Sequence, residues 1–445
     1  MGKLNELTAV DAAAGIAAGD FTAEDLMADC LDRVAARDNE VEAWAYLNPN
    51  YAIRQARDAD AALKVQKARG EKPAPLHGVP VGIKDVIDTV DMPTENGSPA
   101  YQGRRPQADA ACVAALRAAG AVIMGKTVTT ELANIAPSKT RNPHDLDRSP
   151  GGSSAGSGAG VADGQVTLAL GTQTGGSVIR PASFNGIHGF KPTLGMIPRS
   201  GVLMQSHTLD TVGVYGRSLE DLALIADVLS LPDPGDAHSY RGSRAPLMPG
   251  LRAEREEPPR LAFIKTPAWP QADDEAQKAI SAFVASLGET CVETEMPAPF
   301  DDILSLHATV MAVEDLAHYG PLLENSPELV SDMLKSRMAE AEKIRGDDYV
   351  KALLAREKLQ QDFAALFENI DAVIALSAAG TAPRGFETTG NPAFNGPWTY
   401  LGLPCVSLPL LTVSDMPLGV QVIGPFGADA ATLNTARWVE RNGTS

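Results

Sequence analysis

Near the start of the chain, the hydrophobic positions follow the spacing of amphipathic helices. Thr22, with Asp25 three residues later, resembles a capping box at the start of a helix. A second, alanine-rich segment from residue 51 to residue 69 predicts another helix, which Gly70 ends. The helix after Thr22 has one apolar face, formed by Leu26, Cys30, Leu31 and Val34. We therefore expect residues 1–74 to form a group of N-terminal helices.

From about residue 75 onward, short apolar runs alternate with helical patterns and glycine-rich turns. Such alternation is typical of a sheet that is covered by helices. The first three runs are Val79–Ile83, Ala121–Met124 and Val166–Leu170. The later ones are Leu261–Ile264, Ala372–Leu376, Cys405–Leu411 and Leu418–Ile423.

Two segments interrupt this alternation. Residues 232–260 are rich in proline, glycine and charged side chains, which predicts an exposed connection. Residues 301–370 form a long helical and amphipathic stretch. The strands before and after the connection could belong to one sheet or to two, and periodicity leaves both possibilities open.

Length and composition bound the fold class. A chain of 445 residues is longer than the roughly 250–300 residues at which single hydrophobic cores usually stop growing. A typical domain size of about 150 residues gives a prior of about three domains. With 44% apolar and 21% charged residues, 40 Gly and 32 Pro, the chain is folded and rich in loops. This composition excludes a disordered, collagen-like or coiled-coil protein.

Charge and cysteine content narrow the classes of partner and site. With a net charge of −18, the overall electrostatic field of the chain does not attract a nucleic acid. We therefore expect no nucleic-acid partner. The 4 Cys contain no C-x-x-C pair, so neither a disulfide framework nor a zinc site is predicted, and a reducing compartment fits. There is no signal-peptide pattern and no apolar run of about 18 residues. We expect a cytoplasmic protein without a membrane partner.

The stretch Gly120–Thr127 has the spacing of a phosphate-binding P-loop. That mechanism needs a loop whose backbone amides curl around a phosphate, whereas Ala121–Met124 is an apolar run that favours a strand. We interpret the match as chance and Lys126 as an ordinary structural or surface lysine.

A second stretch, Gly152–Gly156, fits the nucleophile elbow of α/β-hydrolases, with Ser154 at its centre. The elbow needs a preceding strand and a later acid and histidine, but residues 142–150 read as a polar loop and the last histidine is His318. The histidines near glycine-rich segments show no spacing that marks a base: His77, His144, His188 and His207. Serine chemistry in this chain would need another base, and lysine is the main candidate.

The stretch Gly171–Ser177 is the most suggestive chemically. It follows an apolar run and places a hydroxyl directly after Gly175 and Gly176, where backbone amides approach a substrate without interference from a Cβ atom. Amides that face a developing oxyanion are usually the largest catalytic contribution. A tight strand-to-helix turn is the alternative interpretation.

Together these motifs resemble the amidase signature family of serine hydrolases. Residues 75–85 resemble its lysine motif, residues 142–157 its Gly/Ser-rich loop and residues 171–177 its nucleophile motif. Similar stretches occur at 119–127, 402–409 and 418–425, so the resemblance runs in order over roughly residues 5–440. It implies one large α/β domain over residues 1–445, with a mixed sheet between helices, in place of three domains. The catalytic core would be 75–230, and 301–350 a variable pocket region.

The resemblance also implies a Ser-cisSer-Lys triad. Ser177 would be the nucleophile, Ser153 the proton relay after a cis peptide bond from Gly152, and Lys84 the base, whose pKa burial or hydrogen bonding would have to lower. No metal or organic cofactor is needed. The oxyanion hole would come from the amides of Thr174, Gly175, Gly176 and Ser177, and support from Ser154, Gly152, Thr172 and Gln173.

One departure from the family pattern stands out. Many members carry Asp four residues before the nucleophile and Arg two residues after it. Here those places hold Gln173 and Ile179, with Arg180 one position later. We interpret this as the coherent replacement of an acid–base pair.

From these features we predict hydrolysis of a small non-peptide amide, anilide, ester or carbamate (urethane) through an acyl-enzyme on Ser177. The partner would be a small hydrophobic or aryl substrate, and the chain a monomer or homodimer. One alternative is the glutaminase subunit of a tRNA-dependent amidotransferase, which Gln173 and the acidic charge disfavour. Another is a non-catalytic binding protein, which the complete triad argues against. Candidate pocket residues, for which core packing is the competing role, are Leu304, Leu306, Val310, Met311, Trp398 and Tyr400.

Overall fold

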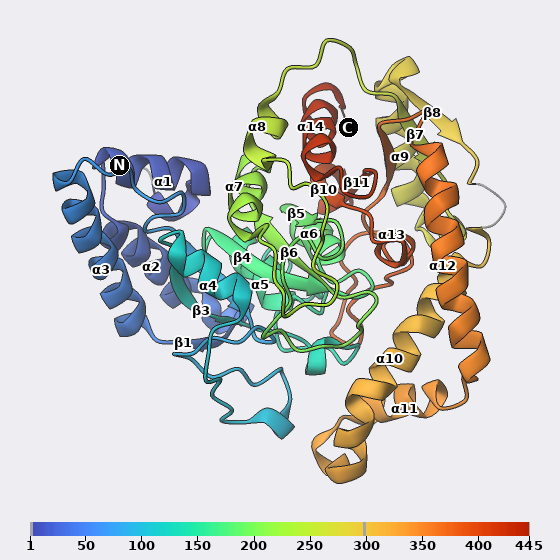
Figure 1. Ribbon diagram of the computed structural model, residues 1–445, viewed down its shortest axis with the longest axis horizontal. Coiled ribbons are helices and arrows are strands. Elements are labelled where there is room, and N and C mark those ends of the chain that lie inside the picture. Colours follow the sequence, from blue (N-terminus) through green and yellow to red (C-terminus); the bar gives the residue numbers. More distant parts are fainter. Residues whose placement is uncertain (1–2, 297–299, 445) are drawn as a thin grey trace.

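The computed structural model describes residues 3–296 and 300–444, and one mixed sheet of eleven strands runs through them (Figure 1). The strand order is β1-β3-β2-β4-β6-β5-β10-β11-β9-β7-β8. Strands from both sides of the 232–260 connection share this sheet, so the predicted single α/β domain is confirmed and the prior of three domains is wrong. The strands are β1 (Trp44–Leu47), β2 (Pro80–Lys84), β3 (Val122–Thr127), β4 (Leu168–Gln173), β5 (His188–Lys191), β6 (Thr211–Gly216), β7 (Leu261–Ile264), β8 (Cys291–Thr294), β9 (Ala372–Leu376), β10 (Cys405–Val413) and β11 (Met416–Ile423).

Helices cover the sheet and extend beyond it at both ends (Figure 1). α1, α2 and α3 gather at one end, while α10, α11 and α12 form an arm at the other. The capping box predicted at Thr22 and Asp25 is present at the start of α2. The helices are α1 (Ala9–Ala18), α2 (Ala23–Val41), α3 (Pro49–Ala68), α4 (Ala111–Ala118), α5 (Ala155–Ala162), α6 (Ile179–Asn185), α7 (Leu219–Leu229), α8 (Leu247–Arg252), α9 (Asp274–Ser286), α10 (Ile303–Asn325), α11 (Asp332–Ala341), α12 (Gly346–Leu366), α13 (Gly396–Leu401) and α14 (Asp429–Asn442).

The pairing of the central strands decides where the motifs meet. β2 runs parallel to both β3 and β4, so the carboxyl ends of these three strands share one edge of the sheet. Lys84 ends β2 and Gln173 ends β4. The lysine motif and the nucleophile motif are therefore neighbours in space although they are far apart in the sequence.

The central strands are apolar on both faces because each face packs against helices. In β4, Leu168 and Leu170 join one hydrophobic cluster with Leu222 of α7, while Ala169 points to the opposite cluster with Ala159 of α5. A strand that is buried on both faces reads as a continuous apolar run, which is what the sequence shows at this position.

The P-loop spacing at residues 120–127 falls on strand β3. Lys126 is fully buried, and its Nζ lies 3.2 Å from Asp85 Oδ1 and donates to Thr94 Oγ1 at 2.5 Å. The lysine therefore joins two segments of the core, in agreement with the structural role predicted for it.

The 232–260 connection includes one short helix. It contains α8, whose Leu247 and Leu251 are buried against α7 and α14. Among residues 3–296 and 300–444, no helix has the length and apolarity needed to cross a membrane.

Candidate active site

Lys84 lies at the centre of the site and is completely buried. Its Nζ donates to Ser153 Oγ at 2.7 Å and to Thr172 Oγ1 at 2.7 Å. Burial lowers the pKa of Lys84 to about 7, because the charged form loses its hydration, and the negative charge of Asp210 opposes part of this shift. A large fraction of this amine is therefore neutral at neutral pH, as a general base must be.

The loop before α5 presents Ser153 to Lys84. The Gly152–Ser153 peptide bond is cis, and the Ser153 carbonyl accepts a hydrogen bond from the Thr130 amide at 3.1 Å. A Cβ atom at position 152 would lie within 2.9 Å of the methyl groups of Thr389 and Thr130. This position therefore requires glycine.

Ser177 is the one residue of the segment 171–180 that is partly exposed, since the other nine are buried. It lies in the tight turn between β4 and α6, and its carbonyl accepts from the Tyr215 hydroxyl at 3.1 Å. A nucleophile must be accessible while its loop stays fixed, and this position meets both requirements.

The loop that carries Ser177 is held by contacts from distant elements. The Thr174 carbonyl contacts His307 Nε2 of α10 at 3.0 Å, and the Gly175 carbonyl accepts from Thr399 Oγ1 of α13 at 2.8 Å. Because a trans peptide unit is planar, its carbonyl and the next amide point in opposite directions. The amides of Gly175 and Gly176 are therefore turned away from the side chains of His307 and Thr399.

Gln173 lies behind this loop. Its Oε1 accepts from the amides of Val178 and Ile179 at 2.8 and 3.0 Å, and its Nε2 donates to Thr399 Oγ1 at 2.9 Å. The side chain thus satisfies two amides at the start of α6 and also supports the residue that holds the Gly175 carbonyl. Gln173 therefore contributes to holding the loop from its inner side.

Arg180 is buried directly beside the Gly152–Ser153 peptide. Its Nη2 donates to the Gly152 carbonyl at 2.7 Å and to Thr389 Oγ1 at 3.2 Å, and its Nε donates to the Thr389 carbonyl at 2.7 Å. It makes no ion pair with a described residue. Burial lowers the pKa of Arg180 to about 10, so the guanidinium stays charged at neutral pH. The sequence shows that this arginine lies one position later than in the family pattern. It gives no signal that Arg180 holds the Gly152–Ser153 loop.

Arg180→Gln is expected to lower kcat about a hundredfold, because loss of the clamp displaces the Ser153 hydroxyl. KM should change little, since Arg180 does not line the cavity described below. Steady-state kinetics test this, with Arg217→Gln as the matched control. Arg217 is another arginine bonded to carbonyls, at Asn5 and Val166, and it lies outside the catalytic loops. An equal fall in kcat for both variants would show that Arg180 contributes to the stability of the fold and not to the position of Ser153.

Ser154 and Thr172 complete the interior of the site. Ser154 is fully buried, and its Oγ lies 3.3 Å from both the amide and the carbonyl of Thr172. This hydroxyl joins α5 to β4 and has neither exposure nor a base. The geometry therefore favours a supporting role for Ser154 over the nucleophile-elbow alternative.

Asp210 contacts the loop of residues 174–177, the predicted oxyanion loop, and its charge acts on Lys84. It accepts from Thr174 Oγ1 at 2.5 Å and from the amides of Gln205 and Ser206 at 2.7 and 2.9 Å. Burial raises its pKa, while these hydrogen bonds act in the opposite direction. Asp210 follows no recognisable motif, and sequence reasoning missed it.

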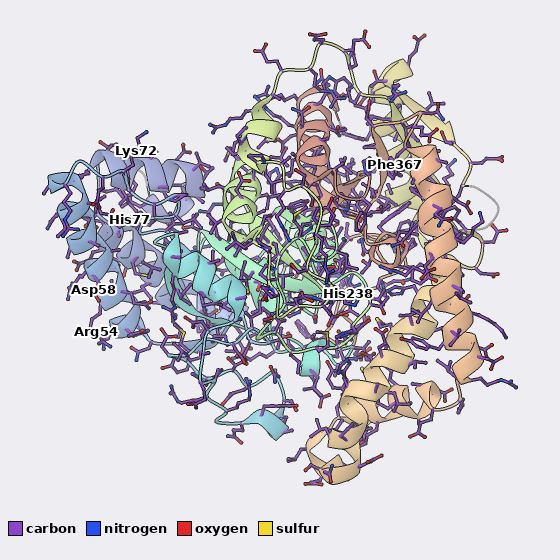
Figure 2. The ribbon with its side chains drawn as sticks, in the orientation of Figure 1. Arg54, Asp58, Lys72, His77, His238 and Phe367 are labelled. Carbon is purple, nitrogen blue, oxygen red and sulfur yellow. The ribbon has the colours of Figure 1, made fainter. Side chains whose placement is uncertain are left out.

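None of the histidines in the described part of the chain is placed as the base. His77 contacts the Ala59 carbonyl at 2.9 Å among the N-terminal helices (Figure 2), and His144 contacts the Asn185 carbonyl. His188 contacts Glu440, and burial lowers the pKa of His307 to about 4, which keeps it neutral beside Thr174. The lysine remains the candidate base.

A cavity of about 620 Å³ adjoins the oxyanion loop. A Cβ atom at Gly175 would lie 3.7 Å from His307 and 3.9 Å from the sulfur of Met311. α10, α11 and residues 391–396 line the cavity, with Leu304 and Met311 among them. Three other predicted pocket residues are instead fully buried in a core cluster: Val310, Trp398 and Tyr400.

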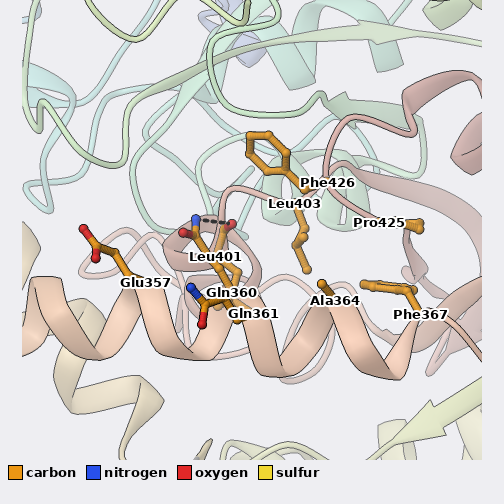
Figure 3. A pocket seen from close by; sticks show the side chains of 9 residues that line it. All are labelled: Glu357, Gln360, Gln361, Ala364, Phe367, Leu401, Leu403, Pro425 and Phe426. Atoms are coloured by element: carbon orange, nitrogen blue, oxygen red, sulfur yellow. Dashed lines mark hydrogen bonds between the residues drawn. The ribbon is translucent and has the colours of Figure 1, made fainter. Parts of the chain in front are cut away.

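A separate cavity of about 520 Å³ lies over α12 (Figure 3). Leu403 points toward the helix there, opposite Gln360 and Ala364, and Phe426 also lines the cavity. No residue of the predicted triad lines it. The predicted triad is also absent from the lining of the cavity beside Gly175, but that cavity reaches the loop of Ser177 through His307, whose Nε2 contacts the Thr174 carbonyl.

Comparison with known proteins gives one family model, two curated relatives and one solved structure. The Amidase family model matches residues 25–433. The chain is 30% identical to a glutamyl-tRNA(Gln) amidotransferase subunit of Natranaerobius thermophilus over 99% of this chain and 96% of that protein. It is 34% identical to the same subunit of Acidothermus cellulolyticus, over 96% and 93%. A solved chain from a vestigial protein complex that bears on the origins of an s-triazine catabolic enzyme superposes with a TM-score of 0.91, at 28% identity and 99% coverage of both chains.

Proposed function

We propose, because the chain belongs to the amidase signature family, that it hydrolyses the side-chain amide of glutamine as the glutaminase subunit of a tRNA-dependent amidotransferase. The observation that carries this proposal is the likeness to such subunits over almost the whole length of both chains. The buried Lys84–Ser153 pair beside the loop of Ser177 supports the chemistry.

The prediction of a hydrolase for small anilides, esters or carbamates is wrong, because the curated relatives are amidotransferase subunits. The same finding overturns the expectation of a hydrophobic or aryl small molecule as partner, with no nucleic acid.

Two features of the sequence had disfavoured the amidotransferase, and neither does so in the structure. Gln173 bonds to amides behind the loop, so it carries no information about the substrate. The net charge of −18 describes one chain and leaves the basic surface of an assembly to other subunits.

In the proposed reaction, neutral Lys84 takes a proton from Ser153 while Ser153 takes the proton of Ser177. The Ser177 oxygen attacks the amide carbon, and the backbone amides of Gly175 and Gly176 stabilise the oxyanion. The carbon–nitrogen bond breaks as the same relay returns the proton to nitrogen, and ammonia leaves. Water then attacks the glutamyl ester by the same route and releases glutamate.

Glutamine carries a carboxylate and an ammonium group at the end opposite its amide. The cavity beside Gly175 has groups of both opposite charges in its lining, Arg337 and Glu340. The Nε of Arg337 lies 3.2 Å from Oδ2 of the buried Asp315, which orients the guanidinium. We propose that Arg337 binds the α-carboxylate of glutamine.

Arg337→Gln is therefore expected to raise KM for glutamine at least tenfold, about what the loss of one charge-assisted bond costs, with a smaller effect on kcat. Glutamate and ammonia release measure this in the purified protein, both by itself and with partner subunits. Arg345→Gln is the matched control, because Arg345 is exposed on the same arm and outside the cavity lining. Turnover of simple anilides or esters without any turnover of glutamine, in the presence of partner subunits, contradicts the proposed function.

A further inference from the structure

A second polar cavity, of about 350 Å³, lies outside the active site. It is located between the turn after α8 and the C-terminal part of α14, two helices that pack together near the C-terminus (Figure 1). Its lining contains no residue of β2, β4 or the catalytic loops. The lining contains four arginines, one tryptophan and the asparagine that orders them: Arg252, Arg255, Arg437, Arg441, Trp438 and Asn434.

Two of these arginines are fixed by a rigid frame. The buried Asn434 donates to three backbone carbonyls of residues 250–253, at 2.8 to 3.1 Å, and its Oδ1 accepts from Arg255 Nη1 at 3.0 Å. Arg437 Nη1 donates to the Leu251 carbonyl at 3.1 Å. Within the described residues, the Nε atoms of Arg255 and Arg437 are buried without a hydrogen-bond partner. Both guanidinium groups are thus oriented in advance by these contacts.

The charge at this cavity opposes that of the whole chain. The protein carries −18, yet four guanidinium groups converge here, and Glu254 is the carboxylate in the lining. Arg255 reaches Asp371 at 3.5 Å, whereas Arg252, Arg437 and Arg441 make no ion pair with any residue of 3–296 or 300–444. Converging like charges repel one another, and a bound anion would relieve that repulsion.

We propose that this cavity binds a nucleotide, with its phosphate on the arginines and its base stacked on Trp438. The planar fork of arginine matches phosphate oxygens in bidentate geometry, and indole rings stack on bases of any sequence. The volume lies at the small end of ligand pockets, so it suits one nucleotide unit. That unit is either a free nucleotide or the terminal residue of an RNA strand.

Titration of the full chain with adenosine monophosphate, followed by tryptophan fluorescence, tests this site. We expect quenching by the nucleotide, weaker binding of inorganic phosphate and of adenosine alone, and no quenching in Trp438→Phe. Arg441→Gln should weaken binding about tenfold and lower its salt dependence. Arg441 is exposed at the end of α14, so its replacement preserves the fold. Arg384→Gln is the control, because Arg384 is an exposed arginine paired with Asp145 elsewhere on the surface.

Titration with a short RNA that ends in adenosine distinguishes a site for a free nucleotide from a site for an RNA terminus. Binding of this RNA at least tenfold tighter than the mononucleotide assigns the site to an RNA terminus, and equal binding assigns it to a free nucleotide. Failure of both ligands to quench, or quenching that is unchanged in Arg441→Gln and Trp438→Phe, overturns the proposal. Glutamine hydrolysis by Arg441→Gln should equal that of the wild type, so this outcome is independent of the proposed catalytic function.

Discussion

Lys84→Met is expected to lower kcat/KM for glutamine by about 10²- to 10⁴-fold, the usual contribution of a general base. Methionine has nearly the shape of the lysine stem, so the core stays filled, but Ser153 and Thr172 lose the amine that contacts both hydroxyl groups at 2.7 Å. Steady-state kinetics at saturating and limiting glutamine measure the loss.

The role of Lys84 as a base also predicts how kcat/KM depends on pH. The base must be neutral, and burial holds the pKa of Lys84 at about 7, well below the ordinary lysine value of 10.5. The logarithm of kcat/KM should therefore rise with pH up to about 7 and level off above it. An unmodified lysine would instead place this inflection above pH 10. A flat profile between pH 5.5 and 9, or a Lys84→Met variant within tenfold of the wild type, contradicts the assignment.

The same lowered pKa makes Lys84 a cost to stability. Between pH 7 and about 10.5 the unfolded chain binds a proton that the folded chain lacks, so unfolding becomes harder as pH rises through this window. Lys84→Met removes the penalty, and we expect it to unfold at an equal or higher temperature than the wild type at pH 7. Loss of activity with retained stability separates a missing base from a damaged fold.

Lys191→Met is the matched control for both measurements. Lys191 is a second fully buried lysine, whose Nζ bonds to the carbonyls of Pro192 and Leu403, and burial lowers its pKa as well. It lies on β5, outside the catalytic loops. We expect this variant to keep the inflection near pH 7 and most of the activity.

The sequence predicts the parts of the site that are local in the chain. Lys84, the Gly152–Ser153 turn and the Gly175–Ser177 turn carry local signals, because an apolar run that ends or a cluster of glycine and serine marks a loop. The parallel pairing of β2 with β4 then brings the lysine and nucleophile motifs to one edge of the sheet. Periodicity and turn chemistry thus predict the strands and loops, whereas the roles of Lys84, Ser153 and Ser177 are implied by the resemblance to the amidase signature family.

The supporting contacts depend on the tertiary arrangement and leave no local signal. His307 and Thr399 hold the oxyanion loop from α10 and α13, and Thr389 receives Arg180 from a loop before α13. Their approach is set by the strand order, in which β5 and β6 separate β4 from the late strands. The substrate prediction failed for a related reason, since the role of Gln173 depends on the amides that it contacts.

Ser177→Ala is expected to reduce kcat by about 10⁴- to 10⁶-fold, as removal of a serine nucleophile does in other acyl-transfer enzymes. The change deletes one partly exposed hydroxyl and leaves the Tyr215 contact, which uses the backbone carbonyl. Stability and glutamine affinity should therefore stay close to the wild type. Glutamine binding by the inactive variant, measured by calorimetry, checks that the loop remains intact.

Covalent labelling with a fluorophosphonate identifies the nucleophile directly. Wild type and Ser154→Ala should gain one adduct in the intact mass, Lys84→Met should react slowly, and Ser177→Ala should gain none. The four cysteines do not compete, because all are buried and burial raises the pKa of each thiol to about 12. Full labelling of Ser177→Ala would refute the assignment. Labelling that is lost only in Ser154→Ala would instead place the reaction on the elbow-like turn, whose serine is buried against Thr172 in this fold.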